Sequence, residues 1–307
     1  MVRAILKPMI RLLKYLWRAG QYPSARDFLS MGLGIEARYE RCKAHWSKHL
    51  QLSKVFQRRA LIGLEGARIA VLGAGRLLDL DTETLAEVAA EVDLFDADPG
   101  VLGTWNLLKR RARHNVNFHT HDITGTLANW EACLRTEVFW NERDALEILS
   151  ALKLPESTLC FKEYDCIISL NIMSQLSIYW RDRANKILKR KLGQALAESP
   201  QIQKALDSNA RLLEEQHINQ LQESAAKELL LLSDDRFYYY KDTQSLWQEE
   251  AALQIDIPQE LEGYNLTGSN SWLWHIAPQH IENVEYGEIH RVRALRWSRG
   301  GLGQDGA

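Results

Sequence analysis

The chain has 307 residues, of which 46% are hydrophobic and 25% charged, as is ordinary for a globular protein with a sizeable core. No apolar run approaches the roughly 20 residues that a membrane-spanning helix needs, and no secretory signal is visible. The four cysteines share no spacing typical of a metal site or a disulfide framework. We therefore expect a cytoplasmic protein.

Residues 1–62 are predicted to form a basic helical extension. Residues 1–60 hold thirteen Lys and Arg but three acids, a net charge of +10, which leaves −12 for the rest of the chain. Apolar residues recur at helical spacing near the start, and a second helix is predicted over about 35–61, after a break at Gly32 to Gly34. His45 and His49, one helical turn apart, are interpreted as a surface pair, because a zinc site would need further ligands.

Two roles for this extension stay open. Its positive charge could simply dock it onto the acidic remainder of the chain. Alternatively, it could offer a basic face to RNA or to an anionic membrane surface.

From residue 63 to 300 the pattern alternates between strands and helices. This favours an α/β fold with a doubly wound, mostly parallel seven-stranded sheet, an antiparallel last strand and the N-terminal helical extension. A helical insertion is expected at about 178–226, a loop-rich insertion at about 234–270, and a disordered tail at 301–307. Strands are predicted at 67–72, 91–95, 115–120, 164–170, 228–233, 272–277 and 290–297. Helices are predicted at 77–90, 99–114, 126–152 and 178–227.

A glycine turn and an acid follow the first two predicted strands. Gly73, Ala74 and Gly75 stand between a strand and a helix, where glycines allow a sharp turn and the close approach of a ligand. Asp96 ends the next strand, where a carboxylate can accept hydrogen bonds from both hydroxyls of a ribose. Each feature also has a purely structural interpretation. The turn could be tight without a ligand, and Asp98 before Pro99 is a good helix cap.

The ordered set VLGAG, LFDAD, HDI, YDCIISLNIMSQL and LLLLSD resembles the class I (Rossmann-like) S-adenosylmethionine-dependent methyltransferases. The resemblance spans about residues 67–233. It implies that the glycine turn faces the methionine part of the cofactor, that Asp96 holds the ribose and that Asp122 holds the adenine amino group. Residues after the fourth strand would line the methyl-transfer site. The implied cofactor site comprises Gly73, Ala74, Gly75, Asp96, Ala97, Asp122, Ile123, Ser169 and Asn171.

Two positions depart from the family pattern. Val71 stands where the family usually has an acid, and Leu77 replaces the third glycine of the turn. On the substrate side, Asp234 and His275 are the candidate catalytic residues, because a base is needed wherever the acceptor must lose a proton. For His275 a hydrogen-bonded core histidine is the alternative. Trp272 and Trp274 could form an aromatic substrate wall or be ordinary strand residues.

The expected function is methyl transfer from S-adenosylmethionine to an O or N atom of a small or medium-sized acceptor. RNA- or lipid-directed transfer through the basic extension is one alternative. A binding or scaffold protein that has lost catalysis is another, because a fold does not guarantee a function. A nicotinamide-dependent enzyme fits less well, since the third glycine of the dinucleotide fingerprint is missing.

Overall fold

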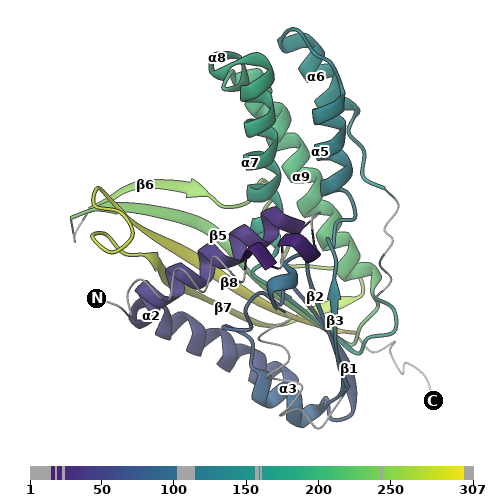
Figure 1. The fold of residues 1–307 in the computed structure, drawn as a ribbon. Helices are drawn as coiled ribbons and strands as arrows, with labels where there is room; N and C mark the ends of the chain where they lie inside the picture. Colours follow the sequence, from purple (N-terminus) through teal and green to yellow (C-terminus); the bar gives the residue numbers. More distant parts are fainter. Residues whose placement is uncertain are drawn as a thin grey trace.

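Figure 1 shows the fold of the chain in a computed structural model. The structure describes residues 15–17, 19–22, 25–101, 115–155, 159, 161–242 and 245–300. The predicted helix near the N-terminus, most of the helix predicted over 99–114 and the tail at 301–307 lie outside the described residues. Among the described helices, none is long and apolar enough to cross a membrane.

One sheet of eight strands forms the centre of the molecule, in the order β3-β2-β1-β4-β5-β8-β7, with β6 paired to β5. The first five strands run parallel, whereas β8 is antiparallel to both of its neighbours, β5 and β7. This confirms the predicted α/β fold. The strands are β1 (Ala67–Leu72), β2 (Ala89–Asp96), β3 (Asn115–Thr120), β4 (Cys166–Leu170), β5 (Glu228–Lys241), β6 (Ser245–Ala251), β7 (Tyr264–Ala277) and β8 (Gly287–Arg299).

Helices cover both faces of the sheet. In Figure 1, α2 runs along one face, while α5, α7 and α9 stand on the other. The strands bury alternate residues on the two faces: Leu229 and Leu231 belong to the core beneath α7 and α9, Leu230 and Leu232 to the core beneath α2. The helical elements are α2 (Arg26–Leu61), α3 (Thr82–Val88), η2 (Pro99–Val101), α5 (Leu127–Thr136), α6 (Glu142–Ala151), α7 (Met173–Leu192), α8 (Gln194–Ala197) and α9 (Pro200–Glu223).

Helix α2 is longer than the sequence indicates, because Gly32 and Gly34 lie inside it rather than in a break. A Cβ atom at Gly32 would overlap the carboxylate of Asp98, in the loop after β2. Glycine therefore lets α2 approach that loop closely, at a propensity cost of about 1 kcal/mol relative to alanine.

Two other boundaries differ from the predictions. The helix expected from Leu77 begins only at Thr82, where the Asp81 side chain caps α3 by accepting a hydrogen bond from Thr84 N. The segment expected to be loop-rich contains β6 and extends β5 as far as Lys241. Aromatic residues at 237–240 favour the strand conformation, which explains the longer β5.

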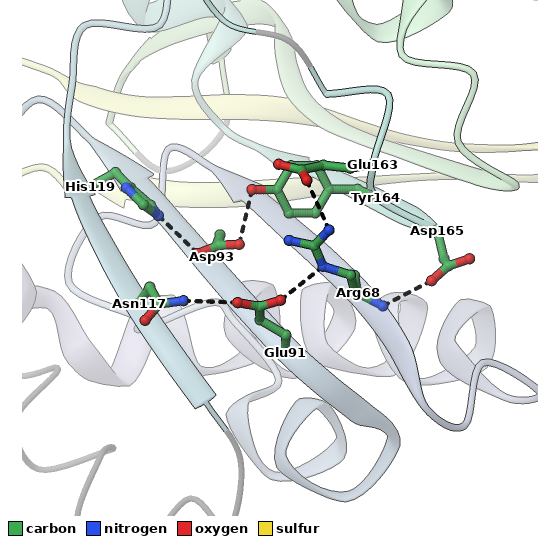
Figure 2. Close-up of polar contacts among 8 residues, drawn as sticks. All are labelled: Arg68, Glu91, Asp93, Asn117, His119, Glu163, Tyr164 and Asp165. Atoms are coloured by element: carbon green, nitrogen blue, oxygen red, sulfur yellow. Dashed lines mark hydrogen bonds and ion pairs between the residues drawn. The ribbon is translucent and has the colours of Figure 1, made fainter.

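A network of polar side chains joins the amino-terminal parts of β1 to β4 (Figure 2). Arg68 Nε lies 2.8 Å from Glu91 Oε2 and its Nη1 lies 2.9 Å from Glu163 Oε2, while Arg68 N donates to Asp165. Further along, Asp93 accepts from Tyr164 Oη at 2.9 Å and lies 2.8 Å from His119 Nε2. These groups bond to one another, so the network is structural.

Candidate functional site at the carboxyl-terminal edge of the sheet

The glycine turn after β1 has a backbone that only particular residues adopt easily. Gly73, Gly75 and Leu77 have φ of 76°, 50° and 59°. A Cβ atom at Gly73 would lie 2.6 Å from Ile172 Cβ and 2.8 Å from Leu170 O, so only glycine fits against the end of β4. Leu77 keeps the left-handed backbone of a glycine, at a steric cost of about 1–2 kcal/mol. Buried Ala74 lies between the two glycines.

Asp96 lies against this turn. Its Oδ2 accepts from Gly75 N and its Oδ1 from Asp98 N, each at 2.7 Å. Burial is the main reason that the pKa of Asp96 is raised to about 6, although both hydrogen bonds oppose that shift. The structure thus brings the predicted ribose ligand and the glycine turn together, with half-buried Ala97 beside them.

Asp122 performs a local structural task. Its carboxylate accepts from Thr124 N, Thr124 Oγ1 and Leu127 N, at 2.8–3.0 Å, and so holds the start of α5. The neighbouring Ile123 is buried in the core beneath α7 and α9. His121 N donates to Asp96 O at 2.9 Å, which places this loop beside the end of β2.

The two predicted residues of the β4 region are both buried but differ in their partners. Ser169 is fully buried, and its Oγ lies 2.8 Å from Nε2 of His217 on α9. Asn171 has a φ of 50°, donates from Nδ2 to Asp79 Oδ2 at 2.7 Å, and donates from its backbone N to Leu232 O at 2.8 Å. Burial raises the pKa of Asp79. Asn171 is therefore the residue of the pair that faces the loop after β1.

Asp234 lies where β5 passes the end of β4, and its partner is a histidine that the sequence analysis missed. His290 Nδ1 lies 2.9 Å from Asp234 Oδ2, and its Nε2 lies 2.8 Å from Glu288 Oε1. Burial lowers the pKa of His290, but the Asp234 and Glu288 carboxylates outweigh burial and raise it to about 9. His290 is therefore a buried cation at neutral pH.

His275 does not join this cluster. It is exposed, because the alternation along β7 turns Trp272 and Trp274 inward and His275 outward. The same alternation in β8 places His290 on the buried face with Val292 and Ala294. That pattern is the signal that could have identified His290.

Trp272 and Trp274 form the contact between β7 and α2. Trp274 stacks on His49 with ring centroids 4.1 Å apart, and Trp272 Nε1 donates to His49 Nδ1 at 3.0 Å. The interpretation of His49 as a surface residue was wrong: it is 1% exposed, and burial lowers its pKa to about 4. The main role of the two tryptophans is therefore to pack α2 against the sheet.

Helix α2 also fixes the loop that follows the glycine turn. Ser53 Oγ and Gln57 Nε2 both donate to Asp79 O, at 3.1 and 2.7 Å. Arg58 Nε lies 3.0 Å from Asp81 Oδ2. The loop is thus anchored by α2 on one side, while Asn171 Nδ2, at the end of β4, donates to Asp79 Oδ2 from the other.

Buried polar atoms of five residues around this edge have no hydrogen-bond partner among the residues that the structure describes. They are Arg76 Nε and Nη2, His121 Nε2, Asn171 Oδ1, Ser174 Oγ and Asp234 Oδ1. Arg76 makes an ion pair through Nη2, 3.1 Å from Asp98 Oδ2. A buried polar group without a partner costs about 1–3 kcal/mol, so a polar ligand at this edge would find favourable bonds to make. A Cβ atom at Gly75 would meet only Gly73 O, at 3.8 Å, so this side of the turn is open.

Comparison of the chain with solved structures finds matches of low sequence identity, several of them to methyltransferases. No protein-family model matches it, and neither does any curated protein. The magnesium protoporphyrin IX methyltransferase of Synechocystis PCC 6803, solved with bound SAH (S-adenosylhomocysteine), is 12% identical over 91% of this chain and 100% of its own, with a TM-score of 0.40. TehB from Haemophilus influenzae is 11% identical over 78% of this chain and 59% of its own, with a TM-score of 0.37. Similarity at this level does not indicate a function, so the function has to be inferred from the residues of the site.

Proposed function

We propose that the chain binds S-adenosylmethionine at the carboxyl-terminal edge of its sheet and transfers the methyl group to an O or N atom of a small or medium-sized acceptor. One observation carries the proposal: the Asp96 carboxylate bonds to the glycine turn, and buried polar atoms around the two lack partners. Binding sites in open α/β sheets lie outside the carboxyl ends of the strands, as this one does.

The residues of this edge fit the chemical groups of the cofactor. Asp96 would accept hydrogen bonds from the ribose hydroxyls, since each oxygen now has one backbone donor and further acceptor capacity. The turn from Gly73 to Gly75 would face the methionine part. The free Nε2 of His121 would lie near the adenine, where the Asp122 carboxylate is already engaged.

The bound cofactor supplies an electrophilic methyl group on a sulfonium. The protein's contribution is to align the acceptor with that group and to exclude water. Asn171 and Asp234, on adjacent strands, are placed beside the turn for this purpose. Helix α2 and the residues that it anchors would close the site from the β7 side.

The two departures from the family pattern bear on this proposal differently. Leu77 supports it, because its φ of 59° keeps the turn geometry that a glycine would give. Val71 is fully buried in β1 and offers no group to a cofactor. A protein that binds the cofactor without turnover is the alternative that Val71 motivates.

Isothermal titration calorimetry with SAH tests the proposal. We expect micromolar binding to the wild-type protein and a loss of about 1.5–3 kcal/mol in Asp96→Ala, because charge-assisted hydrogen bonds are removed. Asp165→Ala is the matched control: this aspartate holds Arg68 at the opposite edge and should leave the SAH affinity unchanged. Absence of binding at millimolar SAH, or equal losses in both variants, would reject the proposal.

A further inference from the structure

Two free oxygens at the carboxyl-terminal edge of the sheet act only as hydrogen-bond acceptors. Asn171 and Asp234 are 5% and 6% exposed, and Asn171 Oδ1 and Asp234 Oδ1 have no partner among the described residues. They lie close in the sheet, because Leu170 pairs with Leu232 and Asn171 N donates to Leu232 O.

The identity of each free atom is fixed by its neighbours. The Asn171 amide points its Nδ2 at Asp79 Oδ2, 2.7 Å away, so its carbonyl oxygen is the free atom. His290 bonds to Oδ2 of Asp234, which leaves Oδ1. Trp274 Nε1, a free donor of β7, lies two strands further along the sheet, whereas Arg76 Nε and the Ser174 hydroxyl are free near the edge itself.

Asn171 also lies beside the part of the turn that would face the reacting methyl group. Ile172, the residue after Asn171, touches the position that a Cβ atom would take at Gly73. The methyl acceptor would therefore have to present its attacking atom to Asn171 and Asp234.

We propose that the methyl acceptor is a nitrogen of a primary amine or amide, held by Asn171 Oδ1 and Asp234 Oδ1, an assignment that rests on the proposed function. Two acceptor oxygens are satisfied by the two N–H groups of such a nitrogen, whereas a hydroxyl has a single hydrogen to donate. The assignment selects N-methylation over O-methylation.

The reaction balances with these residues. The nitrogen lone pair forms a bond to the methyl carbon, the carbon–sulfur bond breaks, and its electron pair stays on sulfur. The extra proton on the methylated nitrogen passes to Asp234 Oδ1 and then to water. Asp234 is the catalytic base. His290 is a positioning residue, which bonds to Oδ2 of Asp234 and so directs Oδ1 toward the acceptor.

Sinefungin is the probe that tests this inference. In this analogue a carbon that bears a primary amine replaces the methylated sulfur of the cofactor, so its amine projects toward the acceptor position. Calorimetry at neutral pH should show that the wild-type protein binds sinefungin about tenfold more tightly than SAH, as charge-assisted hydrogen bonds predict. In Asp234→Asn that preference should fall to about twofold or less, with the SAH affinity unchanged, because an amide N–H replaces the free acceptor.

The possible results separate the two proposals. Equal wild-type affinities for SAH and sinefungin would overturn the nitrogen assignment and leave the cofactor site intact. A sinefungin preference that survives in a folded Asp234→Asn protein would also overturn it. Failure of the wild-type protein to bind SAH would instead reject the proposed function, and this inference with it. The wild-type comparison needs no variant to fold.

Discussion

The hydrogen bonds of Asp96 depend on whether its carboxylate is ionised. When ionised, its carboxylate accepts hydrogen bonds from Gly75 N and Asp98 N and so shapes the turn. Burial raises its pKa from 3.8 to about 6, so the protein ionises this group at a free-energy cost. A ligand with two hydroxyl donors would reduce that cost, which supports the proposal that Asp96 binds the ribose.

The SAH affinity should rise with pH as Asp96 ionises. The stability that its raised pKa contributes to the free protein is fully present below 3.8, the unfolded value, and is lost as the pH rises through about 6. The ribose hydroxyls need the ionised form, so the affinity should increase from about pH 5 to about pH 7. Calorimetry at both pH values checks this, with Asp96→Asn as the control that should show no such rise. A wild-type affinity that is constant or falls would contradict it.

At the residue scale, the sequence predicts groups that end strands better than groups within them. Asp96 and the glycine turn were identifiable because strand ends are marked by glycine and acid. His290 was not, because the alternation along β8 indicates that it points inward but not which group it meets there. Its partner Asp234 lies on another strand, 56 residues away, and only the antiparallel register of β5 and β8 brings the two together.

Helix α2 is held to the sheet by packing and by charge. Trp46 is 2% exposed and its Nε1 donates to Ile276 O at 2.9 Å. Arg38 and Arg41 lie against Glu282, and Arg58 against Asp81. These ion pairs agree with the interpretation that the positive charge of the extension docks it on the acidic remainder.

Trp46→Ala should lower the free energy of unfolding by about 3–5 kcal/mol, because it leaves a large cavity between α2 and β7. His45→Ala, at the exposed neighbouring position, should change it by less than about 0.5 kcal/mol. Urea denaturation measures both. Similar midpoints for the two variants would show that α2 contributes little to stability.

Gly32 and Gly34 provide a matched pair within α2. Gly34→Ala should stabilise the protein by up to about 1 kcal/mol, because a Cβ atom there meets nothing and alanine favours the helix. Gly32→Ala should destabilise it, because the Cβ atom would overlap the Asp98 carboxylate. Thermal denaturation compares the two. A gain in stability at Gly32 would mean that α2 does not lie on the loop after β2.

At the element scale, the hydrophobic pattern predicted the parallel strands well. The signal is strongest in β4 and the first part of β5, which are apolar runs buried on both faces. Strand β6 was not predicted, because it has charged residues, pairs with β5 alone and buries little. The long β5, β7 and β8 exceed their predicted limits because their outer parts are stabilised by cross-strand pairing, which no local window contains.

At the scale of the whole molecule, the two ends of the sheet differ in whether their buried polar groups have partners. The network at the amino-terminal end of the sheet is bonded internally (Figure 2). The carboxyl-terminal edge keeps free polar atoms, and so does α9, at Glu214, Gln216 and His217. A groove between α9 and the segment before β7, lined by Arg211, Glu215 and Asp256, is the competing place for a ligand.

Hydrogen–deuterium exchange with and without SAH tests most directly whether the carboxyl-terminal edge is the cofactor site. We predict that SAH slows exchange in segments 73–81 and 121–125, and leaves segments 163–165 and 227–228 at the opposite edge unchanged. NAD at the same concentration should slow neither pair of segments. Protection confined to α9 and the segment at 254–258, or no protection anywhere, would contradict the assignment of the cofactor to this edge.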